Sequence, residues 1–136
     1  MKTARLCILA FLLLAAVTAC AGGGPTRVAK EWFGAISSAD GATALKFTCD
    51  QYRDEVQMAG ILTAAFGLLG GIDPQSAGAD MSDLDFEVTS KGDDSATVHV
   101  GGEIIVSLLG AAMVQEVDMN LEMIKEDGDW KVCGSY

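Results

Sequence analysis

Four cysteines are the residues of this chain whose chemistry is most open to assignment from the sequence: Cys7, Cys20, Cys49 and Cys133. A cysteine thiolate can be alkylated to a stable thioether, oxidised to a disulfide or bound to a metal ion. The first two lie near the N-terminus, and the other two lie far apart in the rest of the chain. The surroundings of each pair indicate which of these reactions it undergoes.

The residues before Cys20 have the three parts of an export leader. Lys2 and Arg5 are basic, residues 7–17 are almost wholly apolar, and Thr18-Ala19 supply the small side chains that a signal peptidase accepts. The apolar stretch is shorter than the ~20 residues that a membrane-spanning helix needs. A retained membrane helix and an ordinary secretory signal remain as alternatives.

The sequence Val17-Thr18-Ala19-Cys20 resembles the lipobox of bacterial lipoproteins. In these proteins a peptidase cuts before the cysteine, whose sulfur carries a diacylglyceryl group with fatty chains such as palmitate. The resemblance implies that residues 1–19 are a signal peptide, that Cys20 is the lipidation site, and that residues 20–24 are a flexible tether. It places the protein in the bacterial cell envelope, anchored to a membrane on the extracytoplasmic side.

Export also bears on the two remaining cysteines. Cys49 and Cys133 form an even pair in an oxidising compartment, so we expect a disulfide between them. Metal binding by the same two residues is a poor alternative, because His99 is the only histidine and the spacing matches no zinc signature. We expect neither a metal nor a cofactor.

Charge narrows the range of partners. Residues 20–136 hold seven basic residues against nineteen acidic ones, a net charge of −12. A chain this acidic repels nucleic acid and anionic headgroups, and the charge also keeps a surface protein soluble. The length suits one domain, which we place at residues 25–136.

Helical patterns fill the first half of this domain. Pro25 begins a helix whose apolar stripe includes Trp32 and Phe33, and Asp40 is the expected N-cap of a second helix over residues 41–47. A third helix begins near Asp50 and runs to Gly70-Gly71, without a charge from residue 56 to residue 72. A helix that is apolar on every side is expected to be buried on every side. We expect a loop over residues 73–82.

Alternating patterns fill the second half. Apolar and polar residues alternate over residues 84–89, 96–106 and 116–123, and a last strand carries Trp130, Val132 and Cys133. Gly101-Gly102 indicates a bulge or bend in the second strand. Helices followed by a four-stranded antiparallel meander are typical of an α+β domain.

Three segments resemble a known superfamily. They are Val28-Ala29-Lys30-Glu31-Trp32-Phe33-Gly34-Ala35-Ile36, Asp40 at the start of a short helix, and Gly128-Asp129-Trp130-Lys131-Val132-Cys133. They resemble the nuclear-transport-factor-two-like superfamily, and most of all its small bacterial lipoproteins of unknown function. The resemblance implies N-terminal helices packed on a curved four-stranded antiparallel sheet, closed into a cystatin-like cone. Its members include dehydratases, isomerases and non-enzymatic binding modules, so the fold alone assigns no activity.

The large apolar side chains could line a pocket for an apolar ligand or simply fill the core. The candidates are Trp32, Phe33, Phe66, Met119 and Met123. A small domain needs most of its large side chains for stability, which favours a filled core. The uncharged residues 104–114 form a second candidate, because an exposed hairpin there would suit a partner or dimer contact.

Catalytic groups are few among the inward positions of the predicted strands. Those positions are apolar, whereas His99 alternates outward beside Glu103, Asp118 and Glu122. A solvated acidic face explains this arrangement better than a metal site does. Tyr52 and Asp54 on the third helix are the remaining acid–base candidates. We therefore expect a non-catalytic binding module for an envelope protein partner or an apolar small molecule. The alternatives are a dehydratase- or isomerase-like enzyme and a structural envelope subunit.

Overall fold

The structure, a computed structural model, describes residues 23–70, 78–108 and 111–136, apart from the side chains of residues 62–70. The predicted signal peptide, the lipidation site Cys20 and all but the last two residues of the predicted tether lie outside the described residues.

The helices begin where the sequence signals them. α2 (Pro25–Ser37) has proline in its first turn, and α3 (Gly41–Lys46) is capped by Asp40, whose carboxylate accepts a hydrogen bond from the backbone N–H of Thr43 at 3.0 Å. Hydrogen bonding to the side chain and then to the backbone of Thr43 lowers the pKa of Asp40 below its ordinary value. A short 3-10 helix, η2 (Asp50–Tyr52), leads into α4 (Arg53–Gly70). Asp50 is the first residue of η2, whereas the sequence suggested Asp50 as the N-cap of the third helix.

The sheet has five antiparallel strands, and the prediction of four was wrong. They are β1 (Gly78–Asp80), β2 (Leu84–Lys91), β3 (Ser95–Leu108), β4 (Ala111–Glu126) and β5 (Asp129–Ser135). β2, β3, β4 and β5 form the expected meander. β1 and β2 both pair with the edge of β3 opposite to β4: β2 pairs with residues 96–102, and β1 pairs with residues 105–107. β1 comes from the segment predicted as a loop. Its three small or polar residues have no alternating apolar pattern, and only pairing with β3 makes them a strand.

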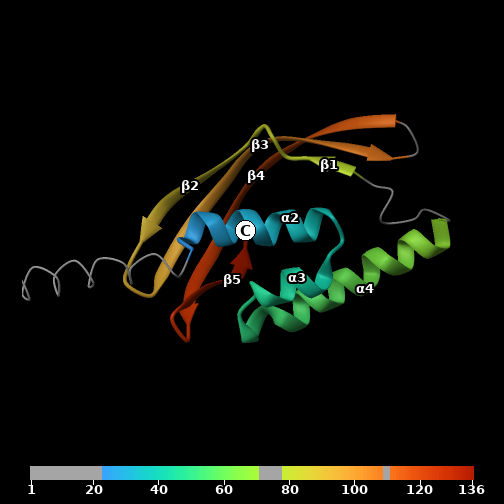
Figure 1. The fold of residues 1–136 in the computed structure, drawn as a ribbon. Coiled ribbons are helices and arrows are strands. Elements are labelled where there is room, and N and C mark those ends of the chain that lie inside the picture. The colour runs from blue at the N-terminus through green and yellow to red at the C-terminus, as the bar shows by residue number, and fades with distance from the viewer. Residues whose placement is uncertain (1–22, 71–77, 109–110) are drawn as a thin grey trace, which may run out of the picture.

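The helices also cover the sheet differently from the prediction of several N-terminal helices packed on it. α2 lies under the curved sheet and contacts β2, β3 and β5 (Figure 1). α3 packs on α2, and α4 packs on α3 and η2 and extends away from the sheet. The core therefore forms mainly between α2 and one sheet face, and it also includes Ala44 of α3 and Val56 of α4. Its fully buried members on the strands are Val98, Val100, Leu121, Met123 and Val132.

Gly102 marks the point where β3 changes its neighbour from β2 to β1. Its φ is +127°, and a Cβ atom there would lie 2.2 Å from the carbonyl oxygen of Asp83. Both observations require glycine, because a side chain would be strained and would also meet fixed backbone. The sequence predicted a bulge or bend here, but the pairing of β3 with β4 stays in register through Gly102. The irregularity is a close approach between β3 and the segment before β2.

Cys133 is the extra residue of a β-bulge. Met123 pairs with Val132 while its neighbour Glu122 pairs with Gly134, so Cys133 has no partner on β4. The bulge frees Cys133 to bond with Cys49, and the Cα atoms of this disulfide are 5.2 Å apart. The disulfide agrees with the prediction from sequence, and the bulge explains how it forms next to the inward-facing Trp130 and Val132.

Two glycine substitutions are expected to have opposite effects on stability. Gly102→Ala should lower the free energy of unfolding by roughly 2–3 kcal/mol, because of backbone strain and the contact with Asp83. Gly60→Ala should raise it by about 1 kcal/mol, because Gly60 lies in α4 with open space around it. Urea denaturation of both variants measures the two values. Equal stability of Gly102→Ala and the parent protein would contradict the close approach.

Candidate functional site

The residues predicted to line a pocket are largely core residues. Trp32 and Phe33 on α2 and Met123 on β4 are buried, and Met119 is half-buried against the same cluster. The indole N–H of Trp32 donates to Thr48 Oγ1 at 2.9 Å, and Phe33 meets Phe86 edge-on with ring centroids 6.0 Å apart. Phe66 lies in the part of α4 for which the structure describes the backbone only. The structure thus brings four of the five together as packed side chains, and a ligand among them stays a prediction.

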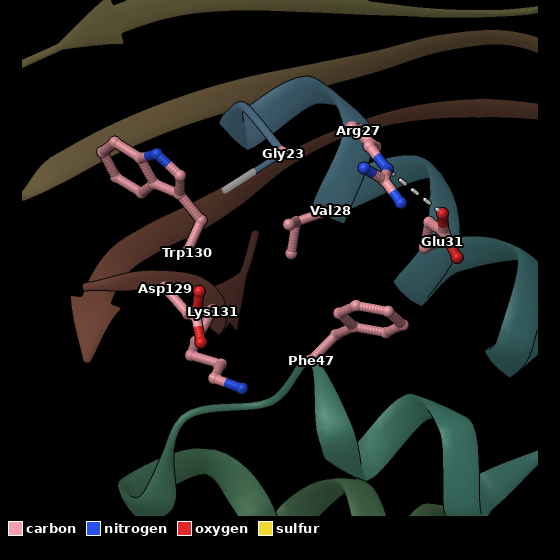
Figure 2. A pocket seen from close by; sticks show the side chains of 8 residues that line it. All are labelled: Gly23, Arg27, Val28, Glu31, Phe47, Asp129, Trp130 and Lys131. Carbon is pink, nitrogen blue, oxygen red and sulfur yellow. Dashed lines mark hydrogen bonds and ion pairs between the residues drawn. The ribbon is translucent and has the colours of Figure 1, made fainter. Parts of the chain in front are cut away.

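A surface cavity of about 210 Å³ lies elsewhere, at the N-terminal end of α2 (Figure 2). Val28 and the aromatic residues Phe47 and Trp130 give it apolar walls, and charged side chains surround them. The full lining is Gly23, Arg27, Val28, Glu31, Phe47, Asp129, Trp130 and Lys131. Sequence reasoning missed this cavity, because its lining comes from both ends of the domain and shows no common motif.

The charges around the cavity balance and are partly engaged. Arg27 Nε lies 3.4 Å from Glu31 Oε1 within α2, and the ammonium of Lys131 donates to the carbonyl oxygen of Lys46. The Arg27 and Glu31 side chains are exposed, so this ion pair adds little to stability. Two basic and two acidic groups in contact with water select for no single ligand charge.

The acid–base candidates from the sequence do not meet at this cavity. Tyr52 and Asp54 lie at the junction of η2 and α4, where the Tyr52 hydroxyl lies 3.1 Å from the Ser135 hydroxyl. Neither residue lines the cavity. Tyr52 therefore serves to join η2 to the end of β5.

His99 lies on the outer face of β3, as its place in the alternation predicts. Its Nε2 atom lies 3.8 Å from a carboxylate oxygen of Asp118, which is exposed to solvent. Within the described part of the chain, His99 belongs to no group of three metal-ligating side chains. The pair is a solvent-facing contact across two strands.

Cys49, Cys133 and Glu126 do form such a group, with one ligand atom from each within 4.8 Å of the others. The two sulfur atoms are joined in the disulfide, and a disulfide sulfur is not the thiolate that binds metals. The carboxylate of Glu126 accepts a hydrogen bond from the backbone N–H of Asp50 at 3.2 Å, beside the disulfide. The group therefore joins the start of η2 to the end of β4.

Large apolar side chains are exposed on α2, α4 and β4, outside the lining of the cavity. Met58 and Ile61 on α4 are 58% and 57% exposed, and Met113 and Val114 on β4 are 56% and 62% exposed. Ile36, near the C-terminal end of α2, is exposed as well. We call these five residues the exposed apolar set. The far ends of α4 and of the β3–β4 hairpin both extend past this end of α2 (Figure 1).

None of the described helices combines the length and the hydropathy needed to cross a membrane. This includes α4, with its long uncharged stretch.

Comparison with known proteins assigns no family. No model of a known protein family matches the chain, and neither does any curated protein. One similar solved structure is the solution structure of RPA3114, a SEC-C motif containing protein from Rhodopseudomonas palustris. It has 16% sequence identity and a TM-score of 0.47, and the match covers 76% of this chain and 70% of that one.

These findings overturn the assignment to the nuclear-transport-factor-two-like superfamily and its small lipoproteins. No family model supports it, and the described sheet has five strands where the resemblance implied four. The segments that suggested it are an amphipathic helix, a capping aspartate and a hairpin, which many α+β proteins share. The likeness to RPA3114 is itself too low to indicate what this chain does.

The disulfide is expected to contribute strongly to stability. Its two cysteines are 84 positions apart, and in the loop-entropy model closing such a loop contributes up to about 4.5 kcal/mol. Replacing Cys49 and Cys133 together by Ala should lower the free energy of unfolding accordingly, and a dithiol reductant should then have no further effect. Non-reducing mass spectrometry of the exported protein checks the bond directly, and two free thiols there would contradict it.

Proposed function

We propose that this protein is a non-catalytic binding module held by lipid on the extracytoplasmic side of a bacterial membrane. It binds an envelope protein partner or an apolar molecule through the exposed apolar set. The observation that carries the proposal is the exposure of Met58, Ile61, Met113 and Val114. Exposed apolar surface on a soluble protein is a candidate interaction site.

The pattern of charge supports this reading. The chain is strongly acidic, yet residues 56–72 and 104–115 carry no charge. These two stretches supply four of the five members of the exposed apolar set. A surface that stays in water has no need to exclude charged residues. A surface that a partner covers does, because burying an unpaired charge is costly.

The position of the anchor supports it as well. Acylation of Cys20 would hold the N-terminal end of α2 near the headgroups, because the five residues from Cys20 to Pro25 reach at most about 18 Å. The exposed residue Ile36 lies near the other end of this 13-residue helix, which is about 20 Å long. An anchor at one end leaves the exposed apolar set free to meet a partner at the other.

The charge also limits what the partner is. An acidic surface repels nucleic acid, so the partner is a protein or an apolar molecule. Two or three fatty chains hold a protein durably on a membrane, since each buried methylene contributes about 0.8 kcal/mol. A durable anchor suits a module that presents a binding surface at a fixed place.

Cys20→Ser tests the anchor. The substitution removes the only sulfur at the lipobox, so the protein should lose its acyl group and appear in the soluble fraction of its own host. Fractionation with mass spectrometry of the N-terminus measures both effects. Cys7→Ser is the matched control and should remain membrane-bound. Continued membrane attachment of the Cys20→Ser protein would contradict the proposal.

The binding surface is tested on the full chain with a neutral solvatochromic dye. Met58→Gln combined with Ile61→Gln, and separately Met113→Gln combined with Val114→Thr, should each lower dye binding at least about threefold, because apolar contact area is lost. Tyr136→Ser is the control, since Tyr136 is equally exposed but lies outside the exposed apolar set.

The same variants identify the class of partner. Native mass spectrometry of protein from its own host should detect a bound lipid or a bound protein, and the two paired variants should lose it. Unchanged dye binding and unchanged partners in both variants would show that the exposed apolar set is not the binding surface.

A further inference from the structure

The first half of β4 is an open edge of the sheet. β4 pairs with β3 along its whole length, but β5 reaches only from Glu126 back to Leu121, and Tyr136 exchanges two backbone hydrogen bonds with Asn120. From Ala111 to Met119, β4 therefore pairs with β3 alone among the described residues. We call these nine positions the free edge.

The other described edges are protected. The outer edge of β2 carries Asp85, Glu87 and Lys91 and is broken by a register shift between Val88 and Ser90. The outer edge of β5 is covered by residues 47–49, which exchange backbone hydrogen bonds with Val132. β1 is only three residues long. Charges, bulges, covering segments and short length are the usual ways in which proteins prevent unwanted strand pairing.

Within the described residues, the free edge is protected only by two charges near one of its ends. It contains no lysine, arginine or proline, and its register with β3 is unbroken. Its only charges are Glu116 and Asp118, near the end that joins β5. The other end is apolar and includes the exposed Met113 and Val114. A long edge without bulges is a template for another strand.

The contact between Asn120 and Tyr136 fixes which backbone groups point outward. Asn120 directs its N–H and C=O away from β3, and in an antiparallel ladder this direction alternates along the strand. The free edge therefore offers the backbone groups of Ala112, Val114, Glu116 and Asp118 to a new neighbour.

We propose that the free edge pairs antiparallel with the free edge of a second copy of this chain, about a two-fold axis at Gln115. This axis pairs the whole nine-residue edge, with the partner strand ending beside Tyr136. All four outward-pointing residues of each copy meet outward-pointing residues of the other, which gives about eight backbone hydrogen bonds. The opposed residues are Ala111 with Met119, Ala112 with Asp118, Met113 with Val117, Val114 with Glu116, and Gln115 with itself.

The like charges of the two copies are kept apart in this register. No acidic residue stands directly opposite another, because Glu116 faces Val114 and Asp118 faces Ala112. A shift of the axis by one residue, to Glu116, would place Glu116 opposite itself, which is destabilising. On the sheet face that packs on the core, Met113 meets Val117, so the apolar ends of both edges are covered. The axis is perpendicular to the sheet, so the same face of both copies points the same way.

A cysteine at the axis tests this register directly. Gln115 and its counterpart form a non-hydrogen-bonded pair, with Cα atoms about 4.5 Å apart, within the range of a disulfide. Full-chain Gln115→Cys, in a mild detergent under air, should form a covalent dimer in most molecules. Thr89→Cys, an exposed position on the edge of β2, is the matched control and should remain largely monomeric. Equal crosslinking of the two variants would overturn the register.

Sedimentation in a density-matched detergent tests the pairing without a crosslink. Val114→Pro removes an outward-pointing N–H and leaves the bonds to β3 intact, so it should weaken dimerisation at least tenfold. Val114→Thr keeps the N–H and the β-branched shape and should weaken it much less. Unaltered circular dichroism shows that each variant is folded.

Salt dependence separates a second copy from a basic partner. Two acidic copies should associate more tightly as ionic strength rises, because their repulsion is screened, whereas a basic strand would bind less tightly. A parent protein that is monomeric at about 100 μM in high salt would overturn the dimer. Dye binding to such a monomer would leave the proposed function standing, since that test does not depend on the edge.

Discussion

The docking of residues 47–49 between α2 and β5 is the contact on which the rest of the structure depends. Thr48 is fully buried; its hydroxyl accepts from the indole of Trp32 and donates to the carbonyl oxygen of Ala44. On either side of Thr48, the carbonyl oxygen of Phe47 accepts a hydrogen bond from the N–H of Val132, and the N–H of Cys49 donates to the carbonyl oxygen of Val132. Cys49 is also joined to Cys133 by the disulfide. One short segment therefore satisfies buried polar groups of the helices, extends the sheet and carries the covalent link. A buried polar group left without a partner costs about 1–3 kcal/mol, so these contacts specify how the two layers meet.

This docking concentrates packing at one end of the molecule. The β5 strand, the disulfide and the start of α2 lie there, and α2 covers the middle of the sheet. Beyond Val56 the described side chains of α4 are exposed, and β4 is exposed on its free edge. Elements with few buried contacts open most easily and are the usual sites of binding and assembly. The firmly packed end is the end next to the proposed anchor, whereas the exposed apolar set and the free edge lie away from it.

Local physics explains which parts of this fold could be predicted from the sequence. The alternation of Val98, Val100 and Leu121 with polar neighbours predicts buried positions, and these are fully buried. Asp40 caps its helix as expected, and two cysteines after a predicted export leader predict the disulfide. The β1 strand was missed because its three residues have no pattern of their own, and the bulge at Cys133 because register depends on the partner strand. The cavity beside Trp130 combines residues from both ends of the domain, which a linear pattern does not reveal. The superfamily resemblance was wrong because it rested on local elements that unrelated folds share.

Binding and self-association share only part of a surface, because Met113 and Val114 belong both to the exposed apolar set and to the free edge. Strand pairing uses the backbone of β4 and the side chains closest to the axis, whereas Met58 and Ile61 lie on α4, away from the sheet edge. Because the two-fold axis is perpendicular to the sheet, both copies keep α2 and α4 on the same side. Two exposed apolar sets would then face the same direction, and one partner could contact both. Two linked sites raise the effective concentration of the second contact, so a modest apolar surface on each copy gives a stronger combined interaction. The absence of charge from residues 104–115 serves both purposes, since it spares the buried edge from repulsion and leaves the neighbouring face apolar.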